Sequence, residues 1–223
     1  MKKFLAIFLL CCFSLVACGE NGKSESGISE TEIPSVADGE VGEIISPDED
    51  DKDYDLGEYR YSPSGTKLYF NDDEYPKELI LTLEKYFMSF AENDFEKYKS
   101  CLSTDYIKEM TSYLEKNYNY GLEKSFSNQR DGLSEKMGGD FHITRLRAEK
   151  NAENSDEIID DYFSALNDVL GEDFYEKIKE NADNFYHITF YVIAEDTENV
   201  ESLLISGYEI VFTEKDGNYY TFG

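Results

Sequence analysis

Apolar residues follow a helical spacing through the middle of the chain. After Pro76 they recur every three or four positions, at Leu79, Leu83, Phe87 and Phe90. This spacing predicts a helix that begins at Pro76, where the missing N–H group costs nothing, and ends near Ala91. Further helical segments are expected after Asn93-Asp94, after Thr104 as N-cap, and up to Met137, before Gly138-Gly139.

The pattern changes in the second half of the chain. Alternating apolar and polar residues predict strands at 141–146, 185–194, 203–213 and 219–222, the last after a tight turn at Asp216-Gly217-Asn218. A helix from Asp156 to Leu170 carries two apolar stripes, which predict a wide buried face. A short hairpin is expected at 59–70. Helices followed by a mainly antiparallel sheet indicate an α+β fold.

The first residues have the features of an export signal. Lys2 and Lys3 precede an apolar stretch from Phe4 to Val16, whose 13 residues are too few to cross a bilayer core of roughly 30 Å. The stretch ends in Leu15-Val16-Ala17-Cys18, which resembles a bacterial lipobox. We expect residues 1–17 to be a lipoprotein signal peptide, with cleavage between Ala17 and Cys18. An ordinary signal peptide with a chance cysteine is the alternative.

The lipobox implies a lipid anchor on Cys18, because a thiolate is the group that a lipid donor can alkylate. The expected location is the outer side of the bacterial cytoplasmic membrane, reached by export and held through the N-terminal lipid. Cys11 and Cys12 leave with the signal peptide, so Cys101 is the remaining thiol and no intrachain disulfide can form. We expect Cys101 to be a small buried apolar residue.

Residues 18–58 form a predicted tether, followed by a single domain at 59–223. From Gly19 to Glu58 there are fourteen acidic residues, two lysines and no apolar periodicity. Such a segment cannot offset the entropy lost on ordering, and we expect a flexible acidic spacer.

One part of this tether resembles a calcium-binding loop. Asp51, Asp53 and Asp55 stand at alternate positions, as in an EF-hand, but Leu56 takes the place of the required glycine and Ser62 that of the final glutamate. A solvated charge run is the favoured interpretation of the three aspartates, and a cation site is the alternative.

The charge of the chain excludes several partner classes. Its 48 acidic residues against 21 basic ones give a formal net charge of −27. Nucleic-acid recognition needs a positive surface, so we expect no nucleic-acid partner. Docking on anionic lipid through a basic patch is excluded on the same ground.

Two stretches resemble nuclear transport factor 2-like domains. The run Leu83-Glu84-Lys85-Tyr86-Phe87, with Asn93-Asp94-Phe95-Glu96-Lys97-Tyr98 after it, resembles their opening. The segment from Ile210 to Tyr220 is similar to their last hairpin. The resemblance covers 76–223 and implies a cystatin-like fold, a cone-shaped curled sheet around helices with a mouth that can hold a ligand. With the lipobox and the acidic spacer, the chain resembles lipoproteins of Gram-positive bacteria. The family includes small-molecule isomerases, dehydratases and non-enzymatic binding modules.

The two histidines are the candidates for acid–base chemistry. Alternation places His187 outside the cone and places His142 on one face with Thr144, Leu146 and Ala148, a face that could point inward. An inward His142 could serve as a general base, although a structural role is more common. No nucleophile motif, phosphate loop or metal-ligand spacing is present, so we expect no cofactor and no metal.

The 18 tyrosines allow a recognition function, because aromatic side chains on an exposed face bind sugars, peptides or partner proteins. For any single tyrosine, a place in the core or at its rim is the favoured interpretation. Tyr191 and Ile193 share the expected outer face of the sheet, which indicates a face for a partner protein or for a second copy in a homodimer. We predict a lipid-anchored binding or interaction module for a small ligand, a peptide or a surface protein. The alternative is an isomerase or hydro-lyase that uses a cone pocket with His142 as its base.

Overall fold

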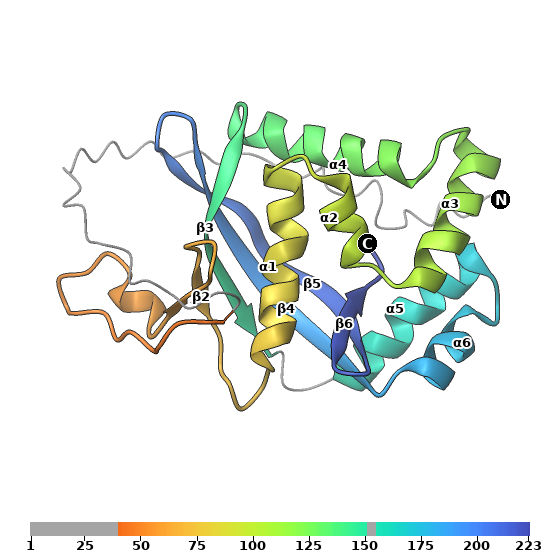
Figure 1. Cartoon of the computed structure of the whole chain (residues 1–223), viewed down its shortest axis with the longest axis horizontal. Helices are drawn as coiled ribbons and strands as arrows, with labels where there is room; N and C mark the ends of the chain where they lie inside the picture. The colour runs from red at the N-terminus through yellow and green to blue at the C-terminus, as the bar shows by residue number, and fades with distance from the viewer. Residues whose placement is uncertain (1–39, 151–154) are drawn as a thin grey trace.

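The computed structural model describes residues 40–150 and 155–223. Within them, six strands form one curled sheet and six α-helices pack around it (Figure 1). This confirms the expected α+β class and the mainly antiparallel sheet. The predicted signal peptide, Cys18 and the first half of the predicted tether lie outside the described residues.

The helices agree closely with the spacing of apolar residues. In chain order they are the short 3-10 helix η1 (Tyr54–Leu56), α1 (Lys77–Ala91), α2 (Phe95–Ser100), α3 (Thr104–Tyr118), α4 (Leu122–Met137), α5 (Ser155–Leu170) and α6 (Phe174–Asn181). The break between α1 and α2 lies at Asn93, which has a φ of 55° and is followed by the N-cap Asp94. The Asp94 side chain accepts a hydrogen bond from the Lys97 N–H. At α3 the N-cap is Ser103, one residue before the expected Thr104.

The strands follow one another across the sheet in the order of the chain. They are β1 (Arg60–Tyr61), β2 (Lys67–Tyr69), β3 (Phe141–Glu149), β4 (Asn184–Asp196), β5 (Glu201–Lys215) and β6 (Asn218–Thr221). Antiparallel pairing joins β1 to β2 and links β3, β4, β5 and β6 in succession, whereas β2 pairs with β3 in parallel. The parallel pair needs a long connection, which α1 to α4 provide.

The core lies between the sheet and α1, which crosses one face of it (Figure 1). We call this the inner face and the opposite one the outer face. Ile188, Phe190, Val192 and Ala194 point to the inner face and are at most 1% exposed. The Phe190 ring lies 4.9 Å from the ring of Phe87 on α1. The interior of the curled sheet is therefore packed with side chains from the helices.

The second half of the predicted tether differs from the prediction. Residues 40–58, which we call the strap, run along the outer face beside β1. Ile45 of the strap pairs through backbone hydrogen bonds with Tyr59, the residue before β1. Asp53 in the strap is 2% exposed, because Arg145 and Lys67 on the sheet neutralise its charge. The ordered part of the chain thus begins before the expected residue 59, and the reason is a pair of cations that sequence periodicity does not reveal.

Candidate functional site

His142 does not point into the cone. Its side chain is 59% exposed, and the nearest carboxylate oxygen, on Glu195, lies 3.7 Å from its Nε2 atom. The prediction of an inward His142 is wrong because β3 contains an irregularity between Ile143 and Arg145. The extra residue, Thr144, shifts the alternation by one, so that Ile143 and Leu146 both face inward while His142 turns outward.

His187 lies on the outer face, as expected, but it is buried. Its side chain is 0% exposed and neither ring nitrogen has a hydrogen-bond partner among the described residues. The nearest carboxylate oxygen, on Glu209 of β5, lies 3.5 Å from its Nε2 atom. Burial lowers the pKa of His187, and the Glu209 carboxylate opposes this effect. The ring therefore favours the neutral state in the folded protein.

The lowered pKa of His187 predicts a loss of stability in mildly acidic solution. The unfolded chain takes up the proton first, so the unfolding free energy falls as the pH drops below the ordinary histidine value of about 6.5. We expect urea unfolding to show this fall between about pH 7.5 and about pH 5.5, and His187→Gln to remove most of it. His142→Gln is the matched control and should keep the pH dependence. An equal slope in all three proteins would contradict the prediction.

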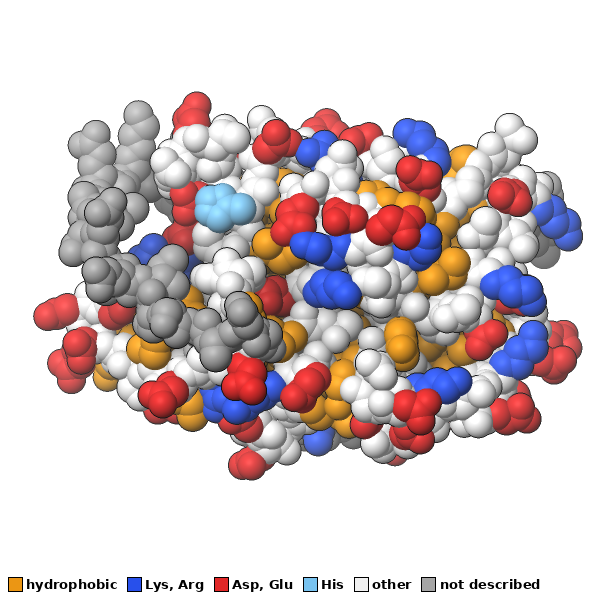
Figure 2. Space-filling view, viewed as in Figure 1, with side chains coloured by type: hydrophobic (Ala, Val, Ile, Leu, Met, Phe, Trp, Pro, Cys, Tyr) orange, Lys and Arg blue, Asp and Glu red, His pale blue; other side chains and the backbone are white. Residues whose placement is uncertain are grey.

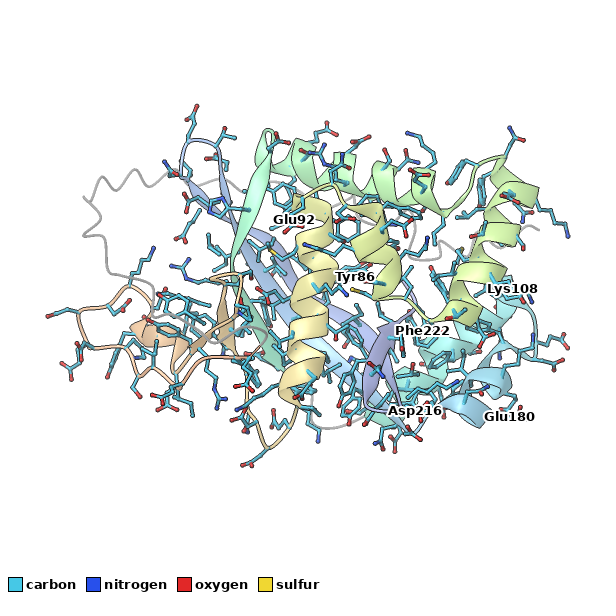
Figure 3. All side chains as sticks on the ribbon, viewed as in Figure 1. Tyr86, Glu92, Lys108, Glu180, Asp216 and Phe222 are labelled. Atoms are coloured by element: carbon cyan, nitrogen blue, oxygen red, sulfur yellow. The ribbon has the colours of Figure 1, made fainter. Side chains whose placement is uncertain are left out.

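The interior of the cone holds aromatic side chains in place of a catalytic pocket. Tyr86 of α1, Tyr98 of α2 and Tyr106 of α3 are each at most 5% exposed. Tyr86 and Phe222 lie among the packed elements, whereas Lys108 on α3 and Glu180 on α6 lie at the outside of the molecule (Figure 3). Burial raises the pKa of Tyr98 to about 12, and it raises the pKa of Tyr86 and Tyr106 well above the usual value. These hydroxyl groups stay protonated at neutral pH and serve as hydrogen-bond groups of the core.

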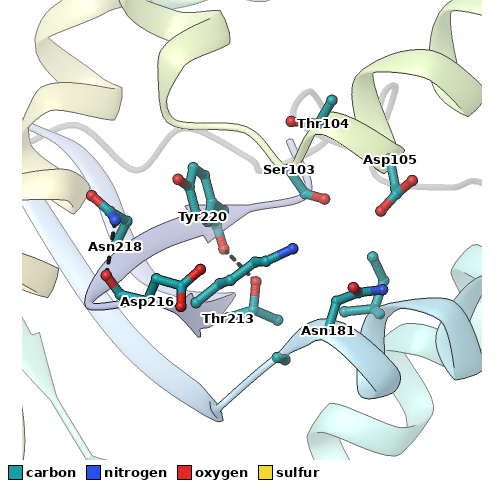
Figure 4. A pocket seen from close by; sticks show the side chains of 11 residues that line it. Ser103, Thr104, Asp105, Asn181, Thr213, Asp216, Asn218 and Tyr220 are labelled. Atoms are coloured by element: carbon teal, nitrogen blue, oxygen red, sulfur yellow. Dashed lines mark hydrogen bonds between the residues drawn. The ribbon is translucent and has the colours of Figure 1, made fainter.

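A polar pocket lies where the β5–β6 hairpin meets the start of α3 and the end of α6 (Figure 4). Its volume is about 240 Å³. The lining consists of neutral polar residues, three charged residues and two apolar ones: Ser103, Thr104, Asn181, Thr213, Asn218 and Tyr220; Asp105, Lys215 and Asp216; Ile178 and Ala182. The pocket can hold a molecule of a few heavy atoms that both donates and accepts hydrogen bonds.

The fold holds several of these groups in place. The Thr213 hydroxyl donates to the Tyr220 carbonyl at 3.4 Å, and the Asn218 amide donates to the Asp216 carbonyl at 3.1 Å (Figure 4). Lys215 has no ion-pair partner among the described residues, although acids surround it in the sequence. The pocket therefore offers one cation, the two carboxylates of Asp105 and Asp216, and neutral donors and acceptors, and it contains no histidine.

Sequence reasoning missed this pocket. The Asp216-Gly217-Asn218 turn was expected, but only as a hairpin turn. The other two contributors, near residues 103–105 and 178–182, are far from the turn in the sequence. No spacing rule links them, because the antiparallel sheet and the helix ends bring them together only in the folded chain.

The three aspartates of the calcium-like loop do not assemble a metal site. Asp53 binds Lys67 and Arg145, and the Asp51 carboxylate accepts a hydrogen bond from the Asp53 N–H at 2.9 Å. No cluster of three metal-ligating side chains occurs in residues 40–150 or 155–223. Asp53 is therefore an ion-pair partner and the EF-hand interpretation of the loop is not supported by its geometry.

Cys101, the remaining cysteine, is 0% exposed, as predicted, and burial raises the pKa of its thiol. Acidic and basic side chains are interspersed over the face shown in Figure 2. Across the described part of the chain, no helix combines the length and apolar character that crossing a membrane requires.

Comparison of the chain with protein-family models, with curated proteins and with solved structures gave no match. The functional argument therefore rests on the residues and their geometry.

Proposed function

We propose that the protein is a lipid-anchored binding module on the outer side of a bacterial cytoplasmic membrane, with a nuclear transport factor 2-like, cone-shaped domain. The lipobox at Leu15 to Cys18 supports the anchor, and the curled sheet around helices is consistent with the cone. The acidic residues after Cys18 would hold the domain away from an anionic surface.

The observation that carries the binding function is the filling of the cone. The rings of Phe90 on α1, Tyr98 on α2 and Phe126 on α4 lie within 5.3 Å of one another and fill the space between these helices. His142, the candidate base of the enzyme alternative, lies on the exposed outer face. A general base must reach the proton that it removes in an enclosed site, and this geometry does not favour it.

We place the ligand site in the polar pocket between α3, α6 and the β5–β6 hairpin. Its mixture of hydroxyl, amide and charged groups suits a small polar molecule or the polar end of a peptide. The Lys215 ammonium would bind a carboxylate of that ligand, and the Asp105 and Asp216 carboxylates in the same lining would accept from its ammonium or hydroxyl donors.

Ligand-observed NMR tests this function directly. A panel of monosaccharides, amino acids and dipeptides is mixed with the full chain, and Lys215→Ala is expected to weaken any binding that is detected by about ten-fold. Lys177→Ala is the matched control, since it removes an exposed lysine of α6 outside the pocket lining. Unchanged binding in Lys215→Ala would move the site elsewhere. Conversion of a panel member into a new product would favour the enzyme alternative.

A further inference from the structure

The strap, residues 40–58, is held to the outer face mainly by polar contacts. Of its side chains, only that of Asp53 is buried. Its apolar residues are only partly covered: Val41 packs against the core and Ile45 and Leu56 are half-buried, whereas Ile44 is 53% exposed and Tyr54 49% exposed. Segments that bury little apolar surface open locally at low free-energy cost. The strap is attached mainly by the ion pairs of Asp53, with the Lys52–Glu201 ion pair and a few backbone hydrogen bonds to Tyr59 and Tyr61 beside them.

The seat of Asp53 is a small basic and aromatic surface. Arg145 Nε donates to Asp53 Oδ1 at 2.9 Å, and Lys67 binds the other carboxylate oxygen. The Lys67 ammonium also lies 4.4 Å from the ring centre of Tyr59, which in turn packs on Tyr69. Lys67 and Arg145 thus place two positive charges side by side in a chain whose formal net charge is −27.

The ion pairs continue beyond the seat. Glu201 of β5 binds Arg145 on the sheet and Lys52 on the strap, the latter at 3.2 Å. When the strap leaves, Arg145 keeps Glu201 as a partner, whereas Lys67 loses its only ion-pair partner among the described residues. The uncovered surface therefore presents at least one free cation beside tyrosine rings.

We propose that the strap detaches from the sheet as a unit while the rest of the domain stays folded, and that the surface it uncovers binds an acidic polypeptide segment. In this structure the strap itself covers that surface as an acidic segment of the same chain. It carries nine acidic residues, and its Asp53 binds Lys67 and Arg145. A segment from another chain with a carboxylate in the same position would compete for these cations. This surface is separate from the polar pocket. A failure of the proposed ligand site would therefore not overturn this proposal, and the reverse also holds.

Hydrogen exchange measured by mass spectrometry tests the detachment. In the full chain, Asp53→Asn is expected to speed exchange of the strap amides by at least about ten-fold and to leave the amides of α1 unchanged. Asp55→Asn is the matched control, because Asp55 is an exposed acid in the same strap and makes no ion pair within the described residues. Equal acceleration in the strap and α1 would overturn the proposal, since the strap would then belong to the cooperative core. An unchanged strap would overturn it as well.

A labelled peptide tests the surface beneath. A synthetic peptide spanning Ile45 to Glu58 is expected to bind the Asp53→Asn chain, and to bind it more weakly as salt is raised. The same peptide with Asp53→Asn is expected not to bind. Equal binding of both peptides, or binding of neither, would show that the seat does not recognise a carboxylate supplied by another chain.

Discussion

Replacement of Phe163 by alanine is expected to lower the unfolding free energy by about 3 to 5 kcal/mol, the largest loss of any single side chain considered for this domain. Phe163 lies on α5, is 0% exposed, and stacks on Tyr175 with ring centres 4.3 Å apart. Its ring also meets the edges of Phe185 and Phe222, at 5.6 and 4.9 Å. Truncation removes contacts to α6, to β4 and to the C-terminal residues at once, and it leaves a cavity that rigid neighbours cannot fill.

Thermal and urea unfolding measure this loss. For a domain of this size the midpoint of thermal unfolding should fall by about 10 °C. Tyr118→Ala is the control, because Tyr118 is an aromatic residue that is 53% exposed, and its replacement should change the unfolding free energy by no more than about 0.5 kcal/mol. A loss below about 1 kcal/mol for Phe163→Ala would mean that α5 does not pack on the sheet as described.

Replacement of Cys18 by alanine is expected to abolish lipid attachment altogether. The lipobox supplies one thiol for alkylation, and alanine has no nucleophilic group to replace it. Cells grown with an alkyne-bearing fatty acid should label the wild-type protein and give no label in Cys18→Ala. Mass spectrometry of the N-terminal peptide should show a modified Cys18 in the wild type alone.

Cys12→Ala serves as the matched control for this experiment. Cys12 lies within the apolar stretch before the lipobox, so its replacement should leave the fatty-acid label intact. Label that persists in Cys18→Ala would refute the anchor. Loss of label in both variants would point to failed export, and the cleavage site read from the mature N-terminus would then decide.

The helices could be predicted from the sequence because their signals are local. Pro76 marks the start of α1, the Asn93-Asp94 pair marks the break before α2, and Gly138, with a φ of 80°, ends α4. Each signal is a steric or hydrogen-bonding property of one or two residues. Such properties act in the same way whatever the rest of the chain does.

The face of His142 could not be predicted, because it depends on a long-range irregularity. Alternation along a single strand assumes an unbroken ladder, and the ladder with β4 slips between Ile143 and Arg145. Nothing in the residues 141–146 marks that slip, since neither glycine nor proline is present. A one-residue slip moves every following side chain to the other face.

The strap escaped prediction for a related reason. The composition of 40–58 indicates disorder when the segment is considered alone, since it is acidic and has no apolar periodicity. In the fold, Asp53 pairs with Lys67 and with Arg145, the latter 92 residues after it in the chain. Composition describes a segment in isolation. It cannot predict an ion pair such as Asp53–Arg145, whose two residues meet only in the folded chain.

The parallel pairing of β2 with β3 has a consequence for how the chain reaches its final form. All of α1 to α4 separates these two neighbouring strands, so their contact closes a long loop. By contrast, short turns join β4, β5 and β6, and the β3–β4 connection is shorter and contains α5 and α6. The ribosome delivers β1 and β2 first, yet they have no sheet to join until β3 has been made. We therefore expect the C-terminal strands to assemble first and the N-terminal hairpin to be added last. Until then β2 pairs with β1 and its other edge stays open, and we expect the nascent chain to be most exposed to aggregation in that interval.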